Sequence, residues 1–211
     1  LNNPNELSQA TFFENDAQAT AAVNAVYAAL QTTGTYTREY FFLHDLLSDE
    51  NRGMGSLEGQ RGQLIDHVYD GSNSVIQLYW QGMYRGINRT NFVLDNIDEA
   101  EDVTPSLRTR LKGEAQFLRA FYYFELVSLF GDIPLLTSQA SSTEGIPRSP
   151  EADVYSVIFS DLDAAEQALP VSYTGADVGR ATKYAAASLK GKARLFRGEY
   201  TQAGQELEKV I

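Results

Sequence analysis

The chain has 211 residues, of which 43% are hydrophobic, so it can bury a sizeable core in one or two domains. Its formal net charge of −11 disfavours binding to the phosphate backbone of nucleic acids and to anionic membrane surfaces. The absence of cysteine excludes disulfides and zinc–thiolate sites, and no stretch approaches the roughly 18 consecutive apolar residues of a membrane-spanning helix.

The first elements are predicted to be helices separated by glycine-rich turns. Asn15 or Asp16 can cap a helix that apolar residues at helical spacing extend towards Gly34. The aromatic segment 37–47 is of uncertain type. Residues 48–62 contain four glycines and are predicted to form a loop.

A long helix is expected over residues 74–97, because apolar side chains recur there every three or four residues. Gly82 and Gly86 lie four residues apart in this helix. Arg85, Asn88 and Arg89 in the same segment exclude a membrane dimer, so the two glycines are expected to allow close packing of soluble helices.

The next helix is predicted to be the central element of the fold. Thr104 and Pro105 have the residue types of an N-cap and a first helical residue. The helix then runs to Phe130, where Gly131 and the following Pro134 end it. Its second half is apolar nearly all round, which indicates a buried helix. The side chains expected in the main core are Phe117, Leu118, Phe121, Phe124 and Leu126.

Arg119 stands out in this helix because it and Glu125 are the only charges between Ala115 and Phe130. A buried guanidinium needs a carboxylate or several carbonyls as partners. We therefore expect a paired core arginine, with Asp45 or Asp49 as the partner. Direct contact with a ligand is the alternative reading.

The C-terminal part of the sequence predicts three more helices. Ser149 and Pro150 open a helix that ends at Leu169, Thr182 caps a helix through Phe196, and Thr201 begins the last one. Residues 182–211 have the pattern of a tetratricopeptide-like helix pair. Its close contacts are expected at Ala186, Gly191 and Ala203, with Leu195 and Tyr200 filling the gaps.

No convincing alternating strand pattern occurs, so the fold is predicted to be all-α, with tetratricopeptide-like helical hairpins packed around the central apolar helix. Residues 1–211 are expected to form a single domain. The last helix has no C-cap residue, and a helical array needs a further unit to cover such a face. We therefore expect the natural protein to continue beyond Ile211.

Several segments, in order along the chain, resemble the SusD/RagB family of surface nutrient-binding lipoproteins. The matching segments are Trp80–Asn91, Gly113–Tyr123, Leu129–Pro134, Pro147–Ser149, Val154–Pro170, Gly179–Lys183 and Gly198–Tyr200. The match covers about residues 12–211. The resemblance implies that the chain is the N-terminal portion of a longer helical protein with tetratricopeptide-like helix pairs.

The resemblance also implies a function. Members of the family capture glycans or other nutrients at the cell outer membrane, as surface-exposed lipoproteins. Their partner is a SusC-like TonB-dependent transporter, over which they sit as a lid. Contact with the membrane is expected only through an N-terminal lipid anchor absent from this chain. The alternative is an intracellular tetratricopeptide-type scaffold for protein–protein interaction.

Candidate ligand contacts come from the segment Leu46–Arg52, which resembles a family segment that leads into a ligand-side loop. Asp49, Asn51 and Arg52, together with Arg38, can hydrogen-bond sugar hydroxyls. No aromatic residue follows in the loop up to residue 62, so these residues are expected to form one rim of a site. The 211 residues alone are therefore not expected to bind a glycan tightly.

Signals for an enzyme are poor. Neither His44 nor His67 has a carboxylate or second histidine at metal-ligand spacing, and the sequence contains no Gly-x-Ser-x-Gly or His-Glu-x-x-His motif. We expect no catalytic residue, no metal site and no cofactor.

Overall fold

The computed structural model describes residues 13–50, 58–139 and 145–211, and within these ranges its regular elements are helices. The β-structure within these ranges is a single isolated antiparallel bridge between Ile133 and Ser149. The all-α prediction is confirmed. The helices are α1 (Asp16–Ala29), α2 (Glu39–Leu46), α3 (Gly59–Ile65), α4 (Ser74–Asn96), α5 (Pro105–Phe130), α6 (Glu151–Ala168), α7 (Lys183–Phe196) and α8 (Tyr200–Glu208), with short 3₁₀ helices η2 (Ile97–Glu99) and η3 (Gly175–Asp177).

The chain divides into two compact units. The smaller unit consists of residues 27–86, and the larger unit consists of residues 1–26 and 87–211. None of the helices within the described ranges is both long enough and apolar enough to cross a bilayer.

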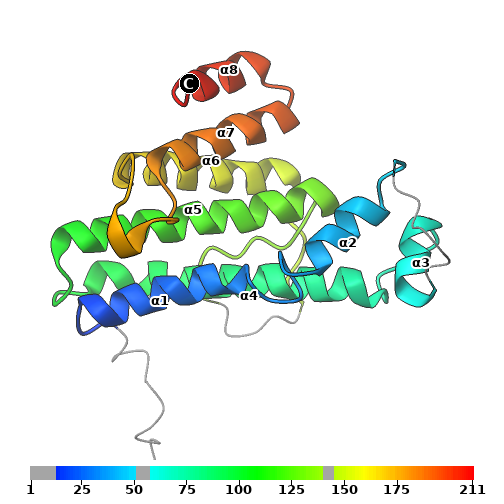
Figure 1. Cartoon of the computed structure of the whole chain (residues 1–211), viewed down its shortest axis with the longest axis horizontal. Coiled ribbons are helices and arrows are strands. Elements are labelled where there is room, and N and C mark those ends of the chain that lie inside the picture. The colour runs from blue at the N-terminus through cyan, green and yellow to red at the C-terminus, as the bar shows by residue number, and fades with distance from the viewer. Residues whose placement is uncertain (1–12, 51–57, 140–144) are drawn as a thin grey trace, which may run out of the picture. The chain divides into compact units, whose positions relative to one another are not determined.

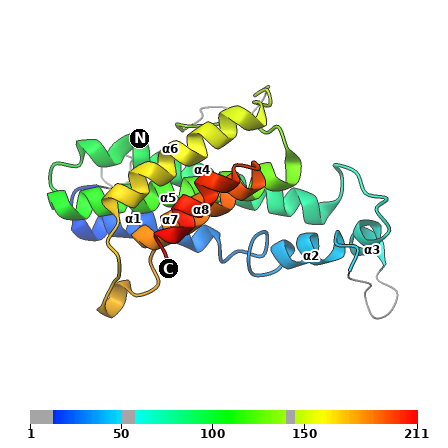
Figure 2. The same cartoon turned by 90° about the horizontal axis from the view of Figure 1, so that it is seen from above.

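In the larger unit, helices α5 to α8 form a stack in which each helix packs against the one before it (Figure 1). Seen from above, α8 lies over α7 (Figure 2). The approach of α5 to α6 is close at Gly113, where a Cβ atom would lie 2.7 Å from the Cβ of Ala168. The predicted central helix is therefore covered along one side by consecutive helices.

The core of the larger unit agrees only in part with the side chains expected from sequence. Leu118, Phe124 and Leu126 are buried as expected. Phe117 and Phe121 are only half-buried, and their rings stack on each other at 6.3 Å.

Two tyrosines occupy core positions of α5 that the sequence analysis did not assign. The hydroxyl of Tyr122 donates to the carbonyl of Val26 at 2.8 Å, and that of Tyr123 lies 2.7 Å from both the carbonyl and the N–H of Leu136. Because these hydroxyls have backbone partners, the rings can be fully buried.

Helix starts in the larger unit follow the sequence prediction with two exceptions. Thr182 caps α7 as expected, since its hydroxyl accepts the N–H of Ala185 at 3.1 Å. Thr104 does not cap α5 with its side chain, because its hydroxyl donates to Asp16 at 2.7 Å. The backbone N–H of Thr104 also donates to Asp16, and these bonds lower the pKa of that carboxyl.

The second exception is the start of α6. Ser149 was expected to open this helix, but its backbone is engaged in the bridge to Ile133. The side chain of Asp132 accepts the N–H of Glu151 at 2.9 Å instead. Asp132, which lies at the start of the segment between α5 and α6, therefore supplies a hydrogen-bond acceptor for a backbone N–H in the first turn of α6.

Arg119 is paired as predicted, but the expected partner was wrong. Its side chain is 12% exposed and forms an ion pair with Asp161 of α6, not with Asp45 or Asp49. Its Nη1 also donates to Asn91 and to the carbonyl of Thr137, each at 3.0 Å. The guanidinium thus joins α4, α5, α6 and the segment after α5.

A buried lysine links the last three helices. Lys190 of α7 is 8% exposed, and its ammonium lies 2.5 Å from Asp163 of α6 and 2.7 Å from Glu206 of α8. Glu166 lies further away, at 3.9 Å. Lys209 adds a second cation between Glu166 and Glu206.

The α7–α8 pair packs through small residues. Ala186 and Ala203 are buried, and a Cβ atom on Gly191 would lie 2.7 Å from Leu207. The expectation that Leu195 and Tyr200 fill the gaps was wrong, because their side chains are 44% and 73% exposed. Gly198 turns the chain here with a positive φ of 71°.

The smaller unit contains α2, α3 and the first part of α4. The segment of uncertain type forms α2, and α3 begins inside the predicted loop at Gly59. The turn before α2 rests closely on α4, because a Cβ on Gly34 would lie 2.5 Å from the Leu78 carbonyl oxygen. Gly82 was expected to pack against a helix. It instead packs against the turn before α2, since a Cβ added to Gly82 would lie 2.7 Å from the Thr35 methyl.

Candidate functional site

The outward face of α2 carries a row of exposed residues of mixed chemistry. Arg38, Phe41 and Asp45 are three and four residues apart, a spacing that places side chains on one helix face, and Asp49 follows just after the helix. We call these four residues the α2 stripe. Phe41 is 51% exposed, so the stripe presents an aromatic ring between a guanidinium and two carboxylates.

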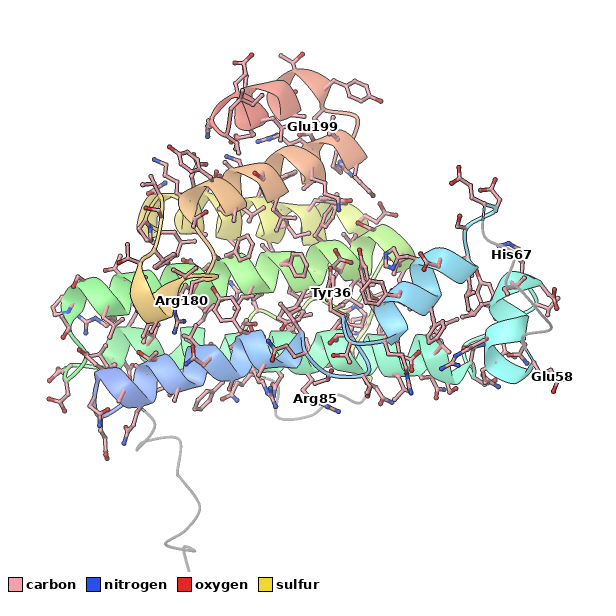
Figure 3. The ribbon with its side chains drawn as sticks, viewed as in Figure 1. Tyr36, Glu58, His67, Arg85, Arg180 and Glu199 are labelled. Atoms are coloured by element: carbon pink, nitrogen blue, oxygen red, sulfur yellow. The ribbon has the colours of Figure 1, made fainter. Side chains whose placement is uncertain are left out.

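Three further rings of the same segment lie against one another, of which two stack. Tyr36 and Tyr40 stack with centroids 4.1 Å apart, and the His44 ring lies 4.1 Å beyond Tyr40. Figure 3 labels Tyr36 in the turn that leads into α2. Tyr40 also meets the Phe41 ring edge-on at 5.5 Å. This contact braces Phe41 from one side while about half of its surface stays open.

Arg38 is held by a buried carboxylate. Its Nε donates to the Glu39 Oε1 at 2.8 Å and its Nη2 bonds to the same oxygen. The two side chains differ sharply in exposure, with 45% for Arg38 and 2% for Glu39. Within the described residues, Nη1 of Arg38 makes no hydrogen bond and the second Glu39 oxygen is buried without one.

The turn that presents the stripe is fixed by hydroxyl groups. The buried Thr35 hydroxyl donates to carbonyl oxygens at the end of α1, 2.9 Å away at Ala29 and 2.8 Å at Leu30. Thr37 donates to the carbonyl of Gln31 at 2.8 Å. With Gly34 seated on α4, these bonds leave the start of α2 little freedom to shift.

The structure places the predicted contact residues as follows. Arg38 and Asp49 both belong to the α2 stripe, but they lie at opposite ends of it, one just before the eight-residue helix and the other after it. Asn51 and Arg52 lie outside the described residues. Of the four predicted contacts, the structure therefore describes Arg38 and Asp49, which lie before and after α2.

Sequence reasoning missed Phe41 and Asp45. The signal was present, since positions 38, 41 and 45 share the spacing of a helix face. It was hidden because aromatic residues occur on every side of this short segment, so no apolar stripe distinguished the inner from the outer face.

Other candidate chemistry is sparse. No group of three or more histidine, aspartate and glutamate side chains within residues 13–50, 58–139 and 145–211 is arranged to hold a metal ion. The larger unit has a cavity of about 340 Å³, lined by Phe13, Glu14, Asn96, Glu99, Ala100, Glu101 and Asp102. Its carboxylates do not form a metal-binding group.

Comparison with protein families and curated proteins gives one consistent result. A family model described as "starch-binding associating with outer membrane" matches residues 2–195. SusD-like protein P2 from Formosa agariphila is 30% identical over 210 residues, which are 97% of this chain and 41% of that protein. SusD-like protein P25 from the same organism is 28% identical over 203 residues, 92% of this chain and 38% of that protein.

Solved structures of similar fold agree with this result. A laminarin-binding SusD-like protein has 28% identity and a TM-score of 0.84, and the match covers 94% of this chain and 44% of that one. A SusD superfamily protein from Bacteroides vulgatus has 25% identity and the same TM-score of 0.84, with 94% and 43% covered. The chain thus spans about two fifths of the length of its curated relatives, 41% and 38% of the two named above.

Proposed function

This chain belongs to the SusD-like family, and from that membership we propose that it captures a glycan at the bacterial cell surface, with the α2 stripe as part of the binding surface. The observation that carries the proposal is the open ring of Phe41 between Arg38 and Asp45. A ring offers an apolar face to the C–H groups of a sugar, and the flanking charges donate to and accept from its hydroxyls.

The stripe supplies the ring that the loop after it lacks. Arg38 and Asp49 keep the roles that the sequence predicts for them, at the two ends of the stripe. Asn51 and Arg52 remain predicted contacts that follow directly in the chain. An extended ligand that runs along α2 could reach both ends, which are separated by the helix of eight residues, about 12 Å long.

The proposed partner is a SusC-like TonB-dependent transporter of the outer membrane, and the proposed location is the cell surface as a lipid-anchored protein. The family description, which includes association with the outer membrane, supports this proposal. It favours a binding protein over the tetratricopeptide-type scaffold, because the family model spans residues 2–195 and so includes nearly all of α7, the first helix of the pair at 182–211.

Calorimetry of the protein encoded by the complete gene against starch, laminarin and other glycans tests the proposal. Phe41→Ala should weaken binding about three- to tenfold, the equivalent of one aromatic contact. Tyr69→Ala is the matched control, because Tyr69 is 40% exposed in the smaller unit but lies outside the stripe. Binding to no glycan, or equal losses in both variants, would contradict the proposal.

A further inference from the structure

The Arg38–Glu39 pair bears on which class of glycan the stripe can accept. Glu39 is buried and lies against the guanidinium through one carboxylate oxygen. Its negative charge therefore offsets the positive charge of Arg38 at the position where a ligand would meet it. An arginine neutralised in this way keeps its hydrogen-bonding geometry but loses most of its attraction for anions.

Arg38 retains donors for a ligand. A guanidinium carries five N–H groups. Glu39 uses the Nε–H and one N–H of Nη2. Nη1 makes no hydrogen bond within the described residues, and the side chain is 45% exposed. The free donors can therefore reach a pair of neighbouring hydroxyls without a full positive charge behind them.

The surroundings add negative charge. Between residues 37 and 52 the chain has Arg38 and Arg52 against Glu39, Asp45, Asp49 and Glu50, a net charge of −2. Asp45, Asp49 and Glu50 are all exposed. Exposed carboxylates accept hydrogen bonds from hydroxyls, but they repel carboxylate and sulfate groups of a ligand.

We infer that the α2 stripe selects uncharged glycans over uronate-containing or sulfated ones, with Glu39 as the positioning residue that holds and neutralises Arg38. This inference rests on the proposed function, because it names the substrate class of the same surface. It assigns specificity to a buried residue that would not touch the ligand.

The test compares binding of the complete protein to neutral and anionic polysaccharides, with laminarin and starch in one set and alginate and polygalacturonate in the other. The wild type should prefer the neutral set. Glu39→Gln should shift the ratio of the two affinities towards the anionic set by about fivefold, the equivalent of one charge contact of about 1 kcal/mol. Arg38→Gln combined with Glu39→Gln should restore the neutral preference with weaker binding overall.

A second variant keeps the test decisive if Glu39→Gln does not fold. Asp45→Asn removes an exposed carboxylate of the stripe and should shift the ratio in the same direction. Asp66→Asn is the matched control, since Asp66 is exposed in the smaller unit outside the stripe. Tighter binding of alginate than of laminarin by the wild type, or no shift with Asp45→Asn, would overturn the inference while leaving glycan binding intact. Failure to bind either set would overturn the proposed function itself.

Discussion

Arg119 and Asp161 face each other between α5 and α6 through two hydrogen bonds, from Nε to Oδ2 at 2.7 Å and from Nη2 to Oδ1 at 2.8 Å. Both side chains are nearly buried, with 12% and 5% of their surface exposed. Loss of Arg119 would also remove the bonds of Nη1 to Asn91 and Thr137, whereas loss of Asp161 would leave the Nε and Nη2 donors without their acceptor.

Removing one member of this pair should be far more damaging than removing both. Arg119→Ala and Asp161→Ala should each lower the free energy of unfolding by about 3–5 kcal/mol, because the other charge stays buried and unpaired. Replacing both by apolar residues, as Arg119→Met with Asp161→Leu, should cost much less than the sum. Urea denaturation of the three variants measures this.

An exposed ion pair provides the control. Lys112 and Asp98 are also close, but their side chains are 37% and 63% exposed. Lys112→Ala should cost less than about 1 kcal/mol. Equal losses for Lys112→Ala and Arg119→Ala would refute the buried role of the Arg119–Asp161 pair.

Tyr123 should make the protein sensitive to alkali. Burial raises the pKa of the Tyr123 phenol to about 12, compared with about 10 in the unfolded chain. Above pH about 10 the unfolded state releases this proton while the folded state retains it, so the free energy of unfolding falls as pH rises towards about 12. Burial also raises the pKa of Tyr122.

The expected loss is about 2–3 kcal/mol from Tyr123 across that window, with none at lower pH. Urea denaturation at a series of pH values measures it. In Tyr123→Phe the slope between pH about 10 and about 12 should be shallower. Tyr200→Phe is the matched control, because Tyr200 is 73% exposed. The same slope in Tyr123→Phe and wild type would show that Tyr123 does not contribute.

Gly34 should not tolerate alanine. The added Cβ would meet the backbone carbonyl of Leu78 at 2.5 Å, and backbone cannot move aside as a flexible side chain can. We expect Gly34→Ala to lower the free energy of unfolding by about 1–3 kcal/mol. Gly204→Ala in α8 is the control, because nothing lies within 4 Å of its Cβ position. It should stabilise the protein by about 0.5–1 kcal/mol. The midpoint temperature of thermal unfolding should fall for Gly34→Ala and rise for Gly204→Ala.

Two phenylalanines of α5 should differ in what they contribute to stability. Phe124 is 2% exposed, so Phe124→Ala should cost about 3–5 kcal/mol. Phe121 was also expected in the core but is only half-buried, so Phe121→Ala should cost clearly less. A larger loss at Phe121 than at Phe124 in urea denaturation would show that the core is centred elsewhere.

The sequence predicted the features that depend on neighbouring residues. The cap at Thr182 involves an N–H three residues away, and the stop at Gly131 needs only its own positive φ of 67°. Both follow from local chemistry, which a sequence displays directly.

Features that depend on packing between distant segments were not predicted. Asp161 lies 42 residues from Arg119, and only the packing of α6 on α5 brings the two together. Phe41 was missed for a related reason. The burial of Leu43 and the exposure of Phe41 are decided by what α2 packs against, and a short segment rich in rings gives no period from which to infer it.

The ammonium of Lys190 limits how the last three helices can be aligned along their axes. The close approach of Gly191 to Leu207 fixes where α7 and α8 meet, and the ion pairs of Lys190 extend this constraint to α6. A slide of one turn, about 5.4 Å, would carry Lys190 away from Asp163 and Glu206 and leave a buried cation unpaired. These ion pairs therefore favour one axial alignment of α6, α7 and α8 over alignments shifted by a turn.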